Sequence, residues 1–246
     1  MRVGTAVAPS LRVLAVDTST ASGSVAVVED GRLVAEVCER DVGGHAAWLL
    51  PAVKSTIEGA GMGPADIDLF ALGLGPGSFT GLRIGVSTVK GLAWTLGRPV
   101  MGVSSLEALA MNLAGSGRGV FVCPLFDARK KEVYRGVYRP AGGRMERVID
   151  DGAARPEALA DELAALDGEV VLLGDGLVLY GDMLARKVPR CRRASEDLWL
   201  VRGSAVAALA LAALADGLRP SDPADIRPRY KRRSEAELKA DGGKGR

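Results

Sequence analysis

A glycine-rich segment, residues 71–85, limits the folds open to this chain more than any other feature. It carries a proline and glycines at 73, 75, 77, 81 and 85 between an apolar strand pattern and an apolar helix pattern. Gly75 and Gly77 suit a tight turn, and Ser78 or Thr80 can cap the helix that follows. The free N–H groups at such a helix start attract anions such as phosphate. The pattern predicts an α/β protein, in which this turn is either an ordinary connection or faces a ligand.

The helix expected at 79–96 keeps glycines at 81, 85 and 91. An interior glycine costs a helix about 0.5–1 kcal/mol relative to alanine. Gly81 and Gly85 lie one turn apart, and Thr88 and Leu92 continue the same face. We therefore expect another backbone to approach there, from a helix of the same lobe or from a second protein. On the second alternative, Gly85→Arg should leave the monomer folded and abolish partner binding.

The order of expected elements repeats between the two halves of the chain. In the first half, strand patterns cover 12–17, 24–28, 33–39, 67–74 and 100–103, and helix patterns cover 45–60 and 79–96. In the second half, strands are expected at 119–126, 132–138, 145–149 and 170–173, and helices at 156–166 and 177–186. Each half reads as a meander followed by a βαβ-like crossover, which favours a mixed sheet. A helix at 204–215 is apolar nearly all round, so we expect it to pack back on the first half.

Composition places the chain among ordinary globular proteins. Its 246 residues are 48% hydrophobic and 25% charged, with a net charge of +2, and they suffice for one large or two modest domains. The first ten residues lack a signal-peptide pattern and the apolar stretch 205–215 is too short to span a bilayer, so a cytoplasmic protein without membrane contact is expected. Cys38, Cys123 and Cys191 are too scattered to indicate a disulfide framework or a zinc site.

Other chemistries remain open at this point. His45 as a base and Ser78 as a nucleophile would suit hydrolysis, but residues 75–81 lack the Gly-x-Ser-x-Gly arrangement of a hydrolase. Asp17 and the glycine-rich segment could instead serve phosphate in a kinase. The basic run Arg227, Arg229, Lys231, Arg232 and Arg233 beside Tyr230 could contact RNA phosphates or form a solvated tail.

Two groups of motifs carry a family resemblance. Asp17-Thr18-Ser19-Thr20, followed by a Gly-Ser-Val-Ala strand, resembles the first phosphate loop of the actin, Hsp70 and sugar-kinase superfamily. His45, Leu49-Leu50-Pro51, the segment 75–85 and Lys90-Gly91-Leu92-Ala93 together resemble the bacterial TsaB (YeaZ) family of the tRNA threonylcarbamoyladenosine pathway. The resemblance covers about residues 11–235, including Leu173-Gly174-Asp175-Gly176 and the run 227–233.

The resemblance implies a two-lobed, actin-like ATPase (ribonuclease H-like) α/β fold with mixed sheets and a reduced second lobe. The first lobe would cover residues 1–104, with helix 204–216 packed back on it. The second, smaller lobe would cover residues 105–200, and residues 217–246 would form a basic C-terminal tail.

The resemblance also implies a function. Members of this family are degenerate relatives of TsaD, which transfers threonylcarbamoyl to adenosine 37 of tRNAs reading codons that begin with A. TsaD holds a metal with a histidine pair, whereas this chain has one histidine, His45. We therefore expect no metal site, no catalytic residues, and a scaffold or activator subunit that binds a TsaD-like transferase. The alternative is an autonomous nucleotide-dependent phosphotransferase or ATPase.

Further partners and sites follow from the same resemblance. A TsaE-like ATPase, a second copy of this chain, and tRNA held through the complex are expected partners. The chain should bind no cofactor stoichiometrically, with ATP or ADP at the complex interface. The expected partner face comprises His45, Trp48, Leu49, Ala52, Val53, Thr56, Gly81, Gly85, Thr88 and Leu92. The candidate nucleotide-binding residues are Asp17, Thr18, Ser19, Gly75, Gly77, Ser78, Gly174, Asp175 and Gly176.

Overall fold

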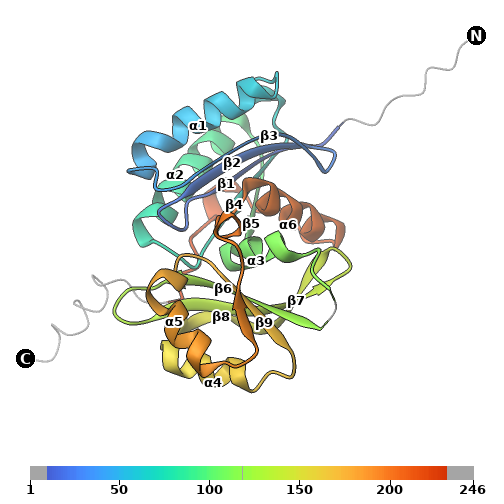
Figure 1. The fold of residues 1–246 in the computed structure, drawn as a ribbon. Helices are drawn as coiled ribbons and strands as arrows, with labels where there is room; N and C mark the ends of the chain where they lie inside the picture. Colours follow the sequence, from blue (N-terminus) through green and yellow to red (C-terminus); the bar gives the residue numbers. More distant parts are fainter. Residues whose placement is uncertain (1–9, 118, 232–246) are drawn as a thin grey trace, which may run out of the picture.

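Five strands form the sheet of the first lobe in the computed structural model, which describes residues 10–117 and 119–231 (Figure 1). They are β1 (Arg12–Asp17), β2 (Gly23–Glu29), β3 (Arg32–Glu39), β4 (Leu69–Gly73) and β5 (Val100–Val103), in the order β3-β2-β1-β4-β5. The first three strands are antiparallel, and β4 and β5 run parallel to β1. Helices α1 (His45–Gly59) and α2 (Phe79–Leu96) cover one face, so this half matches its prediction.

The second lobe repeats this sheet strand for strand. Its strands are β6 (Val120–Asp127), β7 (Val133–Ala141), β8 (Arg144–Ala154), β9 (Glu169–Leu173) and β10 (Cys191–Arg193), in the order β10-β9-β6-β7-β8. Its outer helices, α4 (Pro156–Ala164) and α5 (Leu177–Lys187), have 9 and 11 residues, against 15 and 18 for α1 and α2. The predicted α/β repeat is confirmed, and the reduction of the second lobe concerns the length of its helices.

Two helices lie between the sheets and are exchanged between the lobes (Figure 1). Helix α6 (Gly203–Ala215) follows the second sheet along the chain but packs on all five strands of the first. Helix α3 (Ser105–Ala110) follows the first sheet but packs on β6, β7 and β8 of the second. Short 3-10 helices occur at Pro64–Asp66, Met111–Leu113, Glu196–Leu198 and Pro223–Asp225.

One hydrophobic core runs through both lobes. In β1, Leu14 and Val16 face α1 and α2, while Val13 and Ala15 point to the other side, as the two-residue period of a strand requires. The cluster that contains Val13 continues through α6 and α3 to Tyr138 and other residues of the second sheet. The lobes are therefore joined by buried apolar contacts as well as by the chain.

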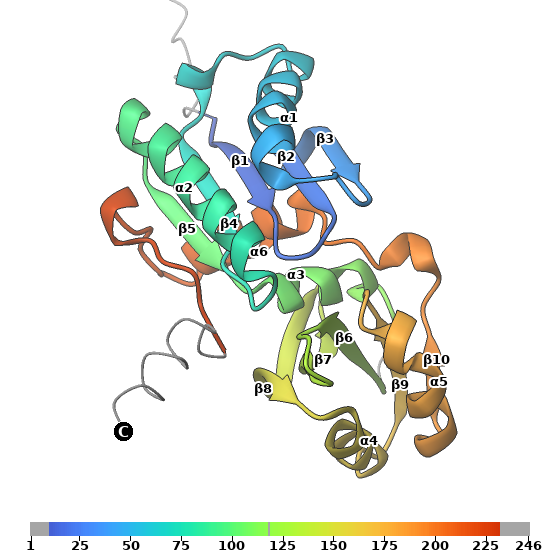
Figure 2. The same cartoon turned by 90° about the vertical axis from the view of Figure 1, so that its left-hand side faces the viewer.

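The segment after α6 returns to the first lobe along β5 and α2 (Figure 2). Ser221 forms an antiparallel bridge with Val100, Lys90 Nζ donates to the carbonyl of Ala224 at 2.8 Å, and Ile226 is buried. The described part of the predicted basic tail, up to Lys231, is therefore docked on the lobe. Arg232 and Arg233 lie outside the described residues. Over the described ranges, every helix is too short or too polar to cross a membrane.

Candidate functional site

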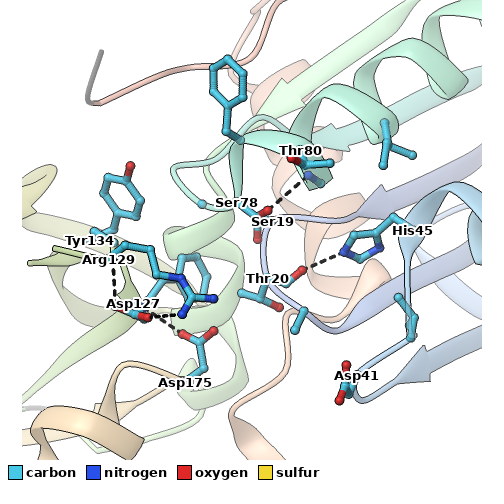
Figure 3. Close-up of a pocket in the computed structure, with 18 of the residues that line it drawn as sticks. Ser19, Thr20, Asp41, His45, Ser78, Thr80, Asp127, Arg129, Tyr134 and Asp175 are labelled. Carbon is cyan, nitrogen blue, oxygen red and sulfur yellow. Dashed lines mark hydrogen bonds and ion pairs between the residues drawn. The ribbon is translucent and has the colours of Figure 1, made fainter. Parts of the chain in front are cut away.

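A cleft of about 1090 Å³ opens between the lobes (Figure 3). The first loop (residues 17–22), the start of α1 and the glycine-rich turn (residues 75–81) line it from the first lobe. The β6–β7 hairpin and the start of α5 line it from the second lobe. Figure 3 shows Ser19, Thr20 and His45 on one side and Asp127, Arg129 and Asp175 on the other.

The first loop hydrogen-bonds within itself. Asp17 is buried, and its Oδ1 accepts from the backbone N–H and the hydroxyl of Ser19 at 2.8 and 2.6 Å. Asp17 Oδ2 accepts from the hydroxyl of Ser105 at 2.7 Å. Burial raises the pKa of Asp17, against the effect of these hydrogen bonds. Three candidate nucleotide-binding residues belong to this loop. Ser19 lines the cleft, whereas Asp17 and Thr18 lie beneath it.

The glycine-rich turn packs against the first loop. Ser78 N donates to the carbonyl of Ser19 at 2.6 Å, and Ser78 Oγ accepts from Gly81 N at 3.3 Å, which is the predicted helix cap. A Cβ at Gly77 would lie 2.2 Å from the carbonyl oxygen of Ser19, so this position has no room for a side chain. Gly75 is buried and donates its N–H to Ser105 Oγ. The N–H groups of Gly75, Ser78 and Gly81 are therefore engaged within the protein.

Two of the three glycines of α2, Gly81 and Gly85, have an intramolecular explanation. A Cβ at Gly81 would lie 2.2 Å from the carbonyl oxygen of Thr18, and one at Gly85 would lie 2.3 Å from Thr18 Oγ1. Thr18 Oγ1 in turn donates to the carbonyl of Gly81 at 2.8 Å. The backbone that approaches this helix therefore belongs to the first loop of the same lobe. We revise the expectation for Gly85→Arg accordingly: the variant should disturb the fold itself.

The predicted stripe on α1 also faces inward. Leu49, Ala52, Val53 and Thr56 are buried in the lobe's own core, because the same helix periodicity describes a core face and a partner face. Trp48 is half-buried and donates to Glu39 Oε2 at 2.7 Å. Of the predicted partner residues on α2, Thr88 and Leu92 are partly exposed.

The helix pair presents other side chains to the outside. Leu50 of α1 is 53% exposed, and Ala46 lies one turn before it and is also exposed. On α2, Ile84 lies one turn before Thr88, and both side chains are partly exposed. We call Ala46, Leu50, Ile84, Thr88 and Leu92 the outer face of the helix pair.

His45 begins α1 and ties it to the first loop. Its Nε2 lies 2.7 Å from the carbonyl oxygen of Thr20, so Nε2–H is the donor. Nδ1 is buried and has no hydrogen-bond partner among residues 10–117 and 119–231. The same described residues contain no cluster of three or more metal-ligating His, Cys, Asp or Glu side chains.

Asp175 reaches the cleft from the second lobe. Its Oδ1 accepts from Asp127 N at 3.1 Å. Gly174 has a φ of 112°, and a Cβ there would lie 2.2 Å from the carbonyl oxygen of Leu125. Gly176 N donates a hydrogen bond to the same carbonyl. The two glycines therefore pack on β6, and Asp175 is the member of this predicted trio that lines the cleft.

Burial, with the nearby charge of Asp127, raises the pKa of Asp175 to about 6. Because this pKa lies above the ordinary value, the contribution of Asp175 to stability is full below pH 4 and is lost as the pH rises through 6. We expect the Asp175 carboxyl carbon to titrate near pH 6 by NMR. Above pH 6, Asp175→Asn should gain stability relative to the wild type. Titration near pH 4 would contradict the burial seen here.

The basic hairpin (residues 128–132) lies between β6 and β7, where a turn of the meander was predicted, but its place beside the cleft was not predicted from the sequence. Arg129, Lys130 and Lys131 have φ values of 61°, 51° and 61°, in the left-handed region. The hairpin is held by Arg129 N, which donates to Asp127 Oδ1 at 2.9 Å, and by Glu132 N, which donates to the carbonyl of Arg129 at 3.0 Å. The available signal was three consecutive cations, Arg129-Lys130-Lys131, between two expected strands.

An aromatic cluster lies at the mouth of the cleft on the first lobe. The rings of Phe79 and Tyr230 stack with centroids 4.7 Å apart and an interplanar angle of 27°. The guanidinium of Arg83 lies 3.9 Å from the centre of the Phe79 ring, and its Nε donates to Tyr230 OH at 3.1 Å. Both rings line the cleft, so the C-terminal segment contributes to this site.

The repeated sheets, the exchanged helices and the cleft between the lobes define the class of the protein: it has the two-lobed actin-like ATPase fold. A family model described as TsaD, tRNA N6-adenosine threonylcarbamoyltransferase, matches residues 34–237. The chain belongs to the TsaB (YeaZ) branch of this family.

Two sequence relatives and one solved structure support the assignment to the TsaB branch. The chain is 35% identical over 174 residues to the tRNA threonylcarbamoyladenosine biosynthesis protein TsaB of Bacillus subtilis, covering 71% of this chain and 75% of the relative. It is 35% identical over 176 residues to TsaB of Escherichia coli, covering 70% and 75%. The solved structure of YeaZ from Pseudomonas aeruginosa superposes with a TM-score of 0.76 at 32% identity, covering 89% of this chain and 99% of that one.

Proposed function

We propose that this chain is a non-catalytic subunit that binds a TsaD-like transferase and is required for threonylcarbamoylation of adenosine 37 in tRNAs reading codons that begin with A. The observation that carries the proposal is the outer face of the helix pair. Leu50 is 53% exposed there, although neighbouring apolar residues of α1 are buried. An exposed leucine beside small and partly exposed aliphatic side chains suits helix-on-helix association. A TsaE-like ATPase and a second copy of this chain are further proposed partners.

Several hydrogen-bond donors beside the cleft already donate to acceptors of the protein itself, which supports a non-catalytic role. The N–H of Ser78 and the hydroxyls of Thr18 and Ser19 all donate to acceptors within the first lobe. A phosphate at this point would have to displace them. We propose that ATP or ADP lies at the interface with the partner. Steady ATP turnover by the isolated protein would favour the alternative, an autonomous phosphotransferase.

Leu50→Arg is expected to weaken binding to the TsaD-like transferase at least tenfold. The substituted side chain would bring a charge into the centre of the proposed interface and remove an apolar contact. Affinity is measured by calorimetry with the two purified proteins. Leu50 does not contribute to the buried core, so the variant should unfold at the wild-type temperature.

Trp94→Arg serves as the matched control for this variant. Trp94 is a 65% exposed apolar residue of α2 that lies on the other side of the helix from Thr88 and Leu92. Its replacement should leave the affinity within about twofold of wild type. Wild-type affinity of a folded Leu50→Arg variant would remove the outer face from the interface.

A further inference from the structure

Two features of the cleft mouth have no part in the proposed binding to a transferase. One is the basic hairpin, in which three successive cations adopt left-handed backbone. Outside glycine this conformation costs roughly 1–2 kcal/mol per residue, so it persists only where the surroundings enforce it. Lys130 and Lys131 are exposed, and Arg129 and Lys130 line the cleft.

The second feature is the aromatic cluster on the opposite wall. Tyr230 stacks on Phe79 with one face and is still 38% exposed, which leaves ring surface for another planar group. Arg229 and Lys231, on either side of Tyr230, are both exposed. Arg229 N donates to the carbonyl of Leu74 at 2.8 Å, which fixes this part of the segment to the first lobe.

Stacking rings flanked by cations are the features with which proteins hold single-stranded nucleic acids. We propose that the mouth of the cleft binds a single-stranded stretch of RNA. A base stacks on Tyr230, and backbone phosphates lie against Lys130 and Lys131. The choice of tRNA as the source of this RNA rests on the proposed function.

The acidic side chains of the cleft, Asp127 and Asp175, leave room for phosphates to bind at the hairpin. Asp127 Oδ2 is 3.3 Å from Arg129 Nη1, so this carboxylate is paired with the first cation of the hairpin. Asp175 accepts a hydrogen bond from the backbone of Asp127. The phosphates are assigned to Lys130 and Lys131, rather than to the floor of the cleft, because both lysine side chains are exposed.

The test measures binding of an unmodified tRNA transcript that reads a codon beginning with A, using the full-length chain alone and in complex with the transferase. Lys130→Asn/Lys131→Asn removes two cations, and asparagine tolerates left-handed backbone. The slope of log K against log salt should fall by roughly 0.7 for each phosphate that is no longer neutralised, about 1.4 for the pair. Arg186→Asn/Lys187→Asn at the exposed end of α5 removes the same charge and should leave the slope unchanged.

Tyr230 is tested separately from the cations. Tyr230→Ala should weaken tRNA binding by roughly five- to 150-fold, because base stacking contributes 1–3 kcal/mol per base. Tyr230→Phe keeps the ring and loses the hydrogen bond from Arg83, so it should stay within about twofold of wild type. A duplex RNA of equal length should not compete with the transcript.

The outcomes separate this inference from the proposed function. Salt curves of the hairpin variant that overlay those of wild type, with the transferase complex intact, would overturn the RNA site and leave the partner role standing. Loss of RNA binding in the hairpin and Tyr230→Ala variants, without any transferase binding by wild type, would keep the RNA site and overturn the partner role. Equal weakening by the α5 control would show only nonspecific attraction and would also overturn the site.

Discussion

Gly81→Ala is expected to lower the free energy of unfolding by about 2–3 kcal/mol, although alanine is the better helix former. The new methyl group would lie 2.2 Å from the carbonyl oxygen of Thr18, which is backbone and cannot rotate away. It would also press on the ring of His45, 3.2 Å away. Either the first loop or the start of α2 must shift, and the hydrogen bond from Thr18 Oγ1 to Gly81 is then strained.

Gly91→Ala in the same helix is the matched control, and its effect should have the opposite sign. Gly91 is exposed and a Cβ there would meet nothing within 4 Å. This variant should gain about 0.5–1 kcal/mol from helix propensity alone. Both variants are compared by denaturant unfolding. Equal stabilisation at both positions would mean that the first loop does not rest on α2.

Asp151→Ala is expected to cost about 3 kcal/mol of unfolding free energy, because it leaves two buried hydroxyls without an acceptor. Asp151 is buried in β8, and its Oδ2 accepts from Ser104 Oγ at 2.5 Å. Its Oδ1 accepts from the hydroxyl of Tyr138. Ser104 also caps α3, since its Oγ accepts from Glu107 N at 3.1 Å. The carboxylate therefore fixes α3, which begins at the end of the first lobe, to the sheet of the second.

Two further variants check this assignment. Asp150→Ala, one residue earlier, removes an exposed carboxylate 3.8 Å from Arg147 Nη1 and should change stability by less than about 0.5 kcal/mol. Tyr138→Phe in the Asp151→Ala background should recover part of the loss, because it removes one orphaned hydroxyl. Stability of Asp151→Ala within about 1 kcal/mol of wild type in thermal unfolding would contradict the role of the network.

The repeated meander and crossover could be predicted because most of these strands and helices carry a clear apolar period. Helix α3 and strand β10 could not. Helix α3 has six residues, too few for a periodic pattern, and is defined by its cap at Ser104 and its burial on the second sheet. Strand β10 has the sequence Cys-Arg-Arg and exists because it pairs with β9.

The candidate site was predictable only in part. Ser19, Gly77, Ser78 and Asp175, which were expected to contact a nucleotide, line the cleft. Helical spacing placed Leu49 on one face of its helix and Gly81 and Gly85 on one face of theirs. It could not distinguish a face that packs on the lobe's own loops from a face that binds a partner. The contact between Phe79 and Tyr230 joins residues far apart in the chain, so no local pattern contains it.

The exchange of α3 and α6 has a consequence for how the protein emerges from the ribosome. The first sheet is complete when β5 ends at Val103, but the helix that covers its inner side begins at Gly203. At about 5–20 residues per second, translation of the intervening stretch takes roughly 5–20 s. During that time Val13, Ala15 and their neighbours lack their native cover, so the nascent chain exposes an apolar surface that a chaperone could bind.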